Sequence, residues 1–535
     1  MYSTTQLLLF GIGTSVLYWI SSIILSNRRH NANAKTLGAV FPMVYPSGLM
    51  GITYVSALRA SAKEDRLSEF MEKRAATMHE KTGRPCHTFM TNILGQDVLV
   101  VGDPRNVQAI LATQFADFGV GHLRQAAISG CIGHGIFTQD GKEWEHSRAL
   151  LRPNFVRQQV GDLNTLERHM QNLLKAIGSA DQDGWTNETN IQLLAFRLTM
   201  DSATEFLLGE SVDTQLEEIA AYVSPSVPHN SVDKAAFSRA WEHASFHMAQ
   251  RVQLGGFYWL HNPKQYAADN RVLHEFVMRY ADQALEKRQQ AEKTDTASSL
   301  HKHKYVFLEA LTEQTQNREE LLSAALNILL AGRETTAMLL SWVLHQLLHH
   351  SDVQQRLRRV VLDTFGTYSD PYNLDFASIK GCQYLQWVLN ETLRYRSIVP
   401  TANRLTTRDT TLPAGGGPDG TTPIYIRKGT SIYVDIHVMH RRKDIWGDDV
   451  EEWKPERFEG RKSGWEYLPF GGGPRICLGQ QFALIEASYV LIRLLQKYDL
   501  FQGKAEHMEK KVQHKIGFTN QPAPPVTLKM HEAAS

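Results

Sequence analysis

The sequence is poor in cysteine, and its charges are balanced. Its four cysteines are Cys86, Cys131, Cys382 and Cys477, and no two of them form a Cys-x-x-Cys pair. This spacing argues against a disulfide framework and against a cysteine-rich zinc site, and it favours a reducing compartment. The formal net charge is only +1, so we expect no general attraction to nucleic acid. A composition that is 42% hydrophobic and 21% charged is typical of a globular protein.

Internal repeats and a nucleotide-binding fingerprint are also missing from the sequence. The Gly/Pro-rich stretch GGGPDG, residues 415–420, is predicted to join two β segments rather than a strand and a helix. We therefore expect no flavin or nicotinamide domain in this chain. Any electrons for redox chemistry would come from a separate protein.

One long apolar run stands near the N-terminus. Residues 7–25 read LLLFGIGTSVLYWISSIIL, and the first charged side chain is Arg28. As a helix this run would span roughly 28 Å, close to the thickness of the hydrocarbon core of a bilayer. The positive flank predicts a single-pass anchor that leaves the bulk of the protein in the cytosol. A cleaved signal peptide is the alternative, but neither a basic n-region nor a small-residue cleavage site is evident.

The remainder is predicted to be one large, mainly α domain with a small β part. We divide the chain into an anchor (1–25), a linker (26–56) and a catalytic domain (57–535). Helical periodicity dominates as far as about residue 400, and short β segments follow between about 400 and 440. Helical spacing returns at Gln480–Leu495.

One predicted helix has an unusual centre. Asn317 can cap its start, with Glu320 completing an N-x-x-E capping box, and the helical period continues to about His350. The sequence AGRETT, residues 331–336, interrupts this apolar helix, and Gly332 costs about 1 kcal/mol relative to alanine. The pattern predicts a helix that is loosened at one turn, so that a ligand can lie against it. An irregular core helix with one exposed charge is the alternative.

The richest motif is PFGGGPRICLGQQF, residues 469–482. A cysteine thiolate is a soft ligand for iron, and a helix N-terminus and nearby cations favour its ionised form. The glycines allow a tight turn and leave room for a flat cofactor, while Arg475 could pair with a carboxylate on it. A buried structural cysteine is the usual alternative. However, five positions match F-x-x-G-x-R-x-C-x-G, namely Phe470, Gly473, Arg475, Cys477 and Gly479.

On this motif the sequence resembles the cytochrome P-450 superfamily, in which the cysteine is the haem ligand. E-T-L-R, residues 391–394, is similar to the family's E-x-x-R helix, and P-E-R-F, residues 455–458, supplies a second arginine. The resemblance implies a structural triad of Glu391, Arg394 and Arg457. E-x-x-R alone is weak evidence, because Glu145 and Arg148 form another, and such a pair is ordinarily a minor helix contact.

Two further stretches resemble haem-binding segments of the same family. W-E-H-S-R, residues 144–148, is similar to the W-x-x-x-R helix, and Arg404 matches another propionate-binding arginine. With Arg475, the resemblance implies that Trp144, Arg148 and Arg404 hold the haem propionates. A packed tryptophan beside an exposed arginine is the alternative for residues 144–148.

AGRETT resembles the family's oxygen-binding segment. The resemblance implies that Thr335 binds oxygen and that Glu334 relays protons. It also implies haem b (iron protoporphyrin IX), O₂ as co-substrate, and insertion of one oxygen atom into a C–H bond of a hydrophobic substrate. NADPH–cytochrome reductase of the endoplasmic reticulum membrane would supply electrons, with cytochrome b5 as a further donor and Lys142 and Arg461 as docking residues. An O₂-independent isomerase or dehydratase and a ligand-binding haem protein are the alternatives from another class.

The substrate class is indicated by two longer resemblances. Residues 197–211 and 477–499, together with the GGGPDG insertion, resemble the fungal group that hydroxylates n-alkanes and fatty acids, although Glu334 stands where that group has aspartate. We expect hydroxylation of a long aliphatic chain, with a tailoring oxygenase of secondary metabolism as the alternative. Pocket residues are expected at 118–132, Leu329, Ile398–Ala402 and Ile516–Thr519. His345 and His349 are spaced to chelate a metal, but no third ligand is evident.

Overall fold

A computed structural model describes residues 4–155, 162–216, 229–293, 305–504 and 512–534 of the chain. The chain divides into two compact units. The smaller unit comprises Met1–Ser56, Glu72–Gly119 and Asn403–Val434, and the larger comprises Ala57–Met71, Val120–Ala402 and Asp435–Ser535. Each unit is described separately below.

The smaller unit is built on a five-stranded sheet with the order β1-β2-β8-β5-β3. Its strands are β1 (Thr88–Ile93), β2 (Gln96–Val101), β3 (Phe118–Gly119), β5 (Thr401–Thr406) and β8 (Ser431–Asp435). Strands β1 and β2 form an antiparallel hairpin, whereas β2 and β8 run parallel. A separate hairpin joins β6 (Thr410–Gly416) to β7 (Thr422–Ile426), and the short helix α4 (Pro104–Gln108) completes the unit. The first two glycines of GGGPDG end β6, and residues 417–420 lead towards β7, so the predicted loop between two β segments is confirmed for residues 417–420.

The β1–β2 hairpin is the main element that the sequence prediction missed. The four residues Val98–Val101 are buried, and three of them are β-branched valines, which favour strands. The turn at Leu94 and Gly95 has a positive φ at both residues, of 50° and 85°. That turn conformation is typical of a tight hairpin. The sequence prediction of a mainly helical period here, with few strand-like runs, therefore did not locate the strands within residues 88–101.

The first helix, α1 (Thr4–Thr36), extends beyond the predicted anchor into the predicted linker. Within the smaller unit its last turns contact the β6–β7 hairpin and the residues beside it. His30 Nδ1 lies 2.7 Å from the Tyr425 hydroxyl, and Asn33 donates to Asp409 at 3.3 Å. Arg427 donates to the side chain of Asn27 at 3.0 Å. Among the described residues, no helix has both the length and the apolar character needed to cross a membrane.

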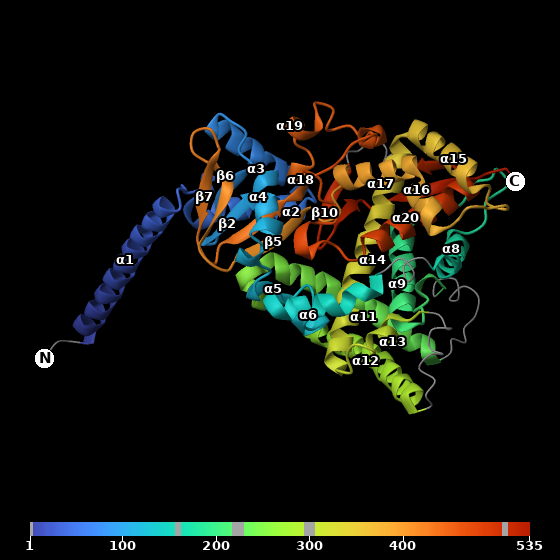
Figure 1. The fold of residues 1–535 in the computed structure, drawn as a ribbon, viewed down its shortest axis with the longest axis horizontal. Helices are drawn as coiled ribbons and strands as arrows, with labels where there is room; N and C mark the ends of the chain where they lie inside the picture. The colour runs from blue at the N-terminus through green and yellow to red at the C-terminus, as the bar shows by residue number, and fades with distance from the viewer. Residues whose placement is uncertain (1–3, 156–161, 217–228, 294–304, 505–511, 535) are drawn as a thin grey trace. The chain divides into compact units, whose positions relative to one another are not determined.

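The larger unit is mainly helical (Figure 1). Two helices, α2 (Ile52–Lys63) and α3 (Leu67–Thr82), have residues in both units. Its other helices are α5 (His122–Ile132), α6 (Gly141–Leu151), α8 (Leu163–Ile177), α9 (Ile191–Leu208), α11 (His229–Leu254), α12 (Lys264–Lys293), α13 (Phe307–Leu311), α14 (Arg318–His349), α15 (Ser351–Phe365), α16 (Phe376–Gly381), α17 (Gln383–Tyr395), α18 (Ile436–Met439), α19 (Lys443–Trp446) and α20 (Gln480–Lys497). Small sheets combine β4 (Thr189–Asn190) with β9 (Tyr498–Gly503) and β12 (Thr527–Glu532), and β10 (Gln513–Ile516) with β11 (Asn520–Ala523).

Helix α14 is the long helix predicted between Asn317 and His350, and it passes through the centre of the larger unit. It packs against α9, α12, α17 and α20 (Figure 1). Because apolar side chains surround most of its length, α14 contributes to both large hydrophobic cores. Asn317 is the N-cap and accepts from the Glu319 amide at 3.0 Å. Glu320 does not close the predicted box, because its carboxylate accepts from the Thr315 hydroxyl instead.

The predicted loosening of α14 at AGRETT is not observed. The helix is continuous from Arg318 to His349. A Cβ placed on Gly332 would lie 4.0 Å from the Cβ of Ala203 on α9, which is an ordinary contact. Side-chain hydroxyls approach the backbone here instead, since Thr335 donates to the Ala331 carbonyl and Thr199 donates to the Arg333 carbonyl. The predicted helix at Gln480–Leu495 is confirmed as α20.

Candidate active site

The loop that carries Cys477 is shaped by its glycines. Gly471 and Gly473 have φ angles of 72° and 67°, which side chains rarely adopt. The chain then makes a short 3₁₀ turn at Gly473–Arg475, and the Cys477 amide donates to the Phe470 carbonyl at 3.0 Å. Cys477 is exposed as a residue, although surrounding protein atoms desolvate its thiol group. The nearest atom to a Cβ on Gly479 would be a ring carbon of Phe155 at 3.9 Å, so there is room beside the backbone of Gly479.

The electrostatic surroundings of Cys477 differ from the prediction. Desolvation by the surrounding protein raises the pKa of the thiol, while a hydrogen bond from the Gly479 backbone and the charge of Arg148 lower it. The desolvation effect is the larger, so the pKa is above its ordinary value. The helix start and the nearby cation thus favour the ionised form, as predicted, but desolvation of the thiol outweighs them. A metal ion bound to the sulfur would supply the missing positive charge.

Arg475 is held firmly beside this loop. Its Nη2 donates to Asp140 at 2.7 Å and to the Gln139 carbonyl at 2.9 Å, and its Nη1 donates to the Ile136 carbonyl at 3.2 Å. The guanidinium lies over the ring of Trp144, 4.3 Å from the centroid. Burial lowers the pKa of Arg475 to about 10, against the opposing effect of Asp140. Arg475 therefore stays charged at neutral pH.

Asp140 was not recognised from the sequence, although it joins three segments of the site. It is the N-cap residue of α6, yet its side chain makes no cap hydrogen bond to that helix. Its Oδ1 accepts from the Val120 amide at 2.8 Å and its Oδ2 from the Gly121 amide at 3.0 Å, directly before α5. Asp140 therefore ties Arg475 to the start of the predicted pocket segment 118–132. No local sequence pattern signals a carboxylate that acts on another helix.

Positive charge exceeds negative charge around Arg475. Half-buried Arg124 on α5 and Arg148 on α6 both lower its pKa, so three guanidinium groups share the neighbourhood of Asp140. Arg148 donates to the Ile476 carbonyl at 3.0 Å, and its guanidinium lies 5.8 Å from the centroid of Trp144. Such an excess in a partly desolvated site fits a ligand with two carboxylates, as haem has. The structure thus brings Trp144, Arg148 and Arg475 together with Cys477, and it adds Arg124.

Arg404 lies in the smaller unit, on β5. Its Nη1 donates to the backbone carbonyl of Asn403 at 2.9 Å. Its role as a propionate ligand stays a prediction.

The AGRETT turn presents one open face of α14. Ala331, Gly332 and Thr335 are half-exposed, whereas Arg333 and Glu334 are buried. Burial raises the pKa of Glu334, so this carboxyl can hold a proton more readily than an ordinary glutamic acid. The predicted pocket residue Leu329 is buried in the core, and the half-exposed residue is its neighbour Leu330.

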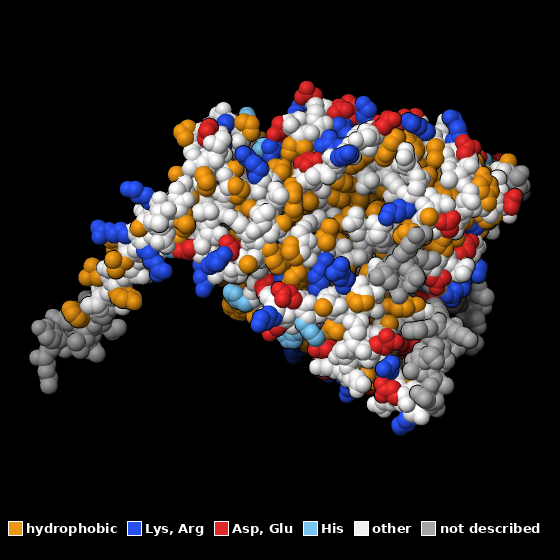
Figure 2. Space-filling model, viewed as in Figure 1, with side chains coloured by type: hydrophobic (Ala, Val, Ile, Leu, Met, Phe, Trp, Pro, Cys, Tyr) orange, Lys and Arg blue, Asp and Glu red, His pale blue; other side chains and the backbone are white. Residues whose placement is uncertain are grey.

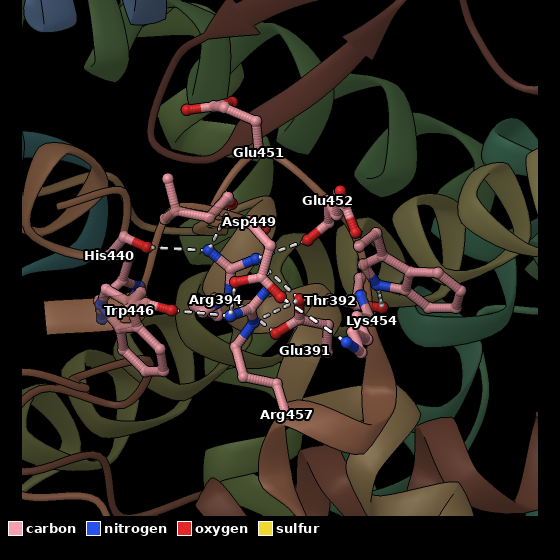
Figure 3. Close-up of polar contacts among 12 residues, drawn as sticks. Glu391, Thr392, Arg394, His440, Trp446, Asp449, Glu451, Glu452, Lys454 and Arg457 are labelled. Atoms are coloured by element: carbon pink, nitrogen blue, oxygen red, sulfur yellow. Dashed lines mark hydrogen bonds and ion pairs between the residues drawn. The ribbon is translucent and has the colours of Figure 1, made fainter. Parts of the chain in front are cut away.

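Glu391, Arg394 and Arg457 are in direct contact, as Figure 3 shows. Arg394 binds both carboxylate oxygens of Glu391 at 2.7 Å, and both side chains are fully buried. Arg457, from the short turn Pro455–Phe458, lies 3.3 Å from the same carboxylate and 2.7 Å from Asp449. The remaining donors of Arg394 reach the carbonyls of His440, Val450 and Glu452 at 3.0–3.1 Å. The pair is thus satisfied on every side.

His440 connects this triad to the cysteine loop, and sequence reasoning missed it. Its carbonyl accepts from Arg394, and its Nε2 accepts from the Leu468 amide at 2.9 Å. Because Nε2 is an acceptor, the ring is neutral with its proton on Nδ1, 3.1 Å from the Ser397 hydroxyl. Burial, assisted by Arg394, lowers the pKa of His440 to about 3. Leu468 directly precedes the segment Pro469–Cys477.

The other candidates are engaged elsewhere. His345 Nδ1 lies 3.1 Å from the Gln346 side chain, and His349 Nδ1 lies 2.8 Å from the His345 carbonyl. The described part of the chain contains no group of three or more potential ligands that could hold a metal ion. Lys142 is exposed, whereas Arg461 lies over Trp446 and 3.6 Å from Glu466.

Comparison with known proteins agrees with this geometry. The family model described as cytochrome P450 matches residues 61–529. The chain belongs to the cytochrome P450 family. It is 44% identical over 498 residues to cytochrome P450 monooxygenase g430 of a Fusarium species, covering 93% of this chain and 86% of that protein. It is 40% identical over 481 residues to cytochrome P450 52A12 of Debaryomyces hansenii, covering 88% of each chain.

A cytochrome P450 52A5 of Candida maltosa is also 40% identical, over 490 residues and 90% of each chain. As a cytochrome P450, the protein is a monooxygenase that uses haem with a cysteine thiolate ligand and O₂. The arrangement of the thiol, the guanidinium groups and the open face of α14 fits that cofactor.

Asp140 offers a test of how this P450 retains haem. In an Asp140→Asn variant, Arg475 and the amides before α5 lose their charged acceptor, and a charge-assisted hydrogen bond contributes about 1.5–3 kcal/mol. We expect haem to dissociate roughly tenfold faster, measured by transfer to apomyoglobin. Asp375→Asn is the matched control, because Asp375 caps its own helix α16. Equal rates for the two variants would show that Asp140 does not hold the site.

His440 predicts how stability depends on pH. Its pKa is about 3 in the folded protein and about 6.5 when unfolded, so unfolding takes up a proton between these values. The contribution of His440 to the free energy of unfolding is therefore fully present above pH 6.5. This contribution falls by ~1.4 kcal/mol per pH unit as the pH drops from 6.5 towards 3. Urea unfolding of the haem-loaded protein at several pH values measures this slope. His440→Gln, which keeps an acceptor near Leu468, is expected to reduce the slope by one proton, and an unchanged slope would contradict the assignment.

Proposed function

We propose that this cytochrome P450 hydroxylates the long aliphatic chain of an alkane or fatty acid at the endoplasmic reticulum membrane. The observation that carries the monooxygenase site is the exposed residue Cys477 in a glycine-shaped loop beside Arg148 and Arg475. The substrate class is supported by the resemblance of residues 197–211 and 477–499 to the alkane and fatty-acid hydroxylases.

Each residue has a defined task in this proposal. Cys477 would hold the iron of haem b, and that iron would supply the oxygen-activating chemistry. Arg148, Arg475 and Trp144, together with Arg404, hold the propionates, while Phe470 and Gly479 shape the loop around the porphyrin. Glu391, Arg394 and Arg457 maintain that loop and touch neither cofactor nor substrate.

Thr335 and Glu334 of α14 would handle protons. The Thr335 hydroxyl now donates to the Ala331 carbonyl at 2.8 Å, and rotation about its χ1 would turn it towards a ligand on the open face of α14. Glu334 is buried and has a raised pKa. An acid whose pKa is raised in this way is suited to donate a proton on the open face of α14.

Membrane association is supported by the distribution of apolar side chains on α1. Phe10, Leu17, Tyr18 and Leu25 are all more than half exposed. Figure 2 shows apolar side chains along this helix, with Lys and Arg side chains near the end that joins the rest of the smaller unit. An apolar helix with a basic flank favours a bilayer and its anionic surface. NADPH–cytochrome reductase, with cytochrome b5 as a second donor, would deliver electrons from the same membrane.

The proposal is tested with the full-length, haem-loaded protein, NADPH–cytochrome reductase and lipid. Alkanes, fatty acids and polyketide-like compounds are screened by the shift of the haem spectrum, and products of the best binders are mapped by mass spectrometry. We expect an O₂-dependent alcohol at or near the end of an aliphatic chain. Preference for a polyketide-like ligand would indicate a tailoring oxygenase. Conversion without O₂ would indicate an isomerase or dehydratase and overturn the proposal.

Valine variants of Thr335 and its neighbour Thr336 test which of the two adjacent hydroxyls takes part in proton delivery. Thr336 is buried, and its hydroxyl makes no hydrogen bond within the described structure, so Thr336→Val should preserve coupling. Thr335→Val removes the hydroxyl from the open face of α14, and proton delivery by a positioned side chain typically contributes about 10²–10⁴-fold. We expect the yield of alcohol per NADPH to fall by at least about tenfold, with hydrogen peroxide in its place. Similar yields from both variants would remove Thr335 from the mechanism.

A further inference from the structure

Arg333 lies between two carboxylates that differ in their exposure. Its Nη2 donates to Glu242 of α11 at 3.0 Å, and its Nη1 lies 3.7 Å from Glu334, the neighbouring residue on α14. The side chain of Glu242 is 56% exposed, whereas those of Arg333 and Glu334 are at most 10% exposed. The guanidinium is thus hydrogen-bonded to the outer acid and only near the inner one.

Helix α9 limits how far Arg333 can move. The guanidinium lies over the ring of Phe196, 4.5 Å from its centroid, and the Thr199 hydroxyl donates to the Arg333 carbonyl at 2.7 Å. The backbone and the plane of the side chain are therefore supported. A small rotation would exchange one carboxylate partner for the other.

Two charged groups act on Glu334 in opposite directions. Arg333 favours its carboxylate form, while Glu242 favours its protonated form, as burial does. The groups that α9 places against Arg333, namely Phe196 and Thr199, are uncharged. The balance between the two states of Glu334 therefore depends on which carboxylate Arg333 binds.

We propose that Glu242 is a positioning residue, which holds Arg333 away from Glu334 and so keeps Glu334 protonated for delivery towards Thr335. This inference rests on the proposed function of Glu334. After Glu334 gives up a proton, Arg333 stabilises the carboxylate until a proton from solvent restores the acid, and Arg333 then returns to Glu242. The cycle transfers protons only and changes no oxidation state.

Removing the outer charge should transfer Arg333 to the inner acid. In Glu242→Gln the amide attracts the guanidinium weakly, and an arginine next to a carboxylate lowers its pKa by roughly 1–3 units. The mutated side chain is exposed, so the fold should tolerate the change. Asp233→Asn is the matched control, because Asp233 is an exposed acid on α11 that pairs with Arg279 at 2.9 Å, outside this cluster.

The decisive measurement is a pH titration of the protonated carboxyl of Glu334 by infrared difference spectroscopy, on the resting haem-loaded protein. The signal is identified by its loss in Glu334→Gln. We expect the midpoint to fall by roughly 1–3 pH units in Glu242→Gln, to stay constant in Asp233→Asn, and to return when Arg333→Gln is added to Glu242→Gln. An unchanged midpoint in Glu242→Gln, or no protonated Glu334 at any pH in the unmodified protein, would overturn the inference.

Measurements of alcohol and peroxide during turnover distinguish a failure of this inference from a failure of the proposed function. If Glu334→Gln leaves the ratio of alcohol to peroxide unchanged, the proton role of Glu334 fails, and the inference fails with it. If Glu334→Gln raises peroxide but Glu242→Gln does not, only the role of Glu242 is wrong. We expect Glu242→Gln to raise peroxide and to increase the solvent isotope effect on alcohol formation, while Asp233→Asn changes neither.

Discussion

The fully buried ion pair of Glu391 and Arg394 is the constraint on which the cysteine loop depends. A buried pair is weak evidence for net stability, but losing one partner costs about 3–5 kcal/mol because the other charge is stranded. Arg394 is tolerated because every donor of its rigid fork has an acceptor, and these acceptors include the carbonyl of His440. Since His440 in turn holds the Leu468 amide, the guanidinium determines where the segment before Cys477 begins.

The elements that were predicted correctly are those whose information is local. Helices α14 and α20 have continuous helical periodicity, and the loop between β6 and β7 is marked by its glycines and proline. The β1–β2 hairpin was missed because its buried run is short and its partner β8 lies more than three hundred residues further along the chain. The predicted loosening of α14 was not observed for a related reason, since a mid-helix glycine lowers local stability but packing against neighbouring helices restores it.

The candidate site shows the same limit. Cys477, Arg475, Trp144 and Arg148 belong to contiguous motifs, so their grouping could be predicted from the sequence. Asp140, Arg124 and His440 act on residues that are far away in the sequence, so no local motif or spacing predicts their roles. The ionisation of Cys477 was misjudged because the sequence displays neighbouring charges but not the loss of water around the thiol.

The contact between α1 and the β6–β7 hairpin has a consequence for geometry. A tether through a flexible segment would limit only how far a protein can drift from a surface. Here the helix continues to Thr36, and His30 and Asn33 are hydrogen-bonded to Tyr425 and Asp409. Because these hydrogen bonds join the last turns of α1 to the hairpin, the helix and the β6–β7 sheet reorient together, and the direction of α1 determines the tilt of that sheet.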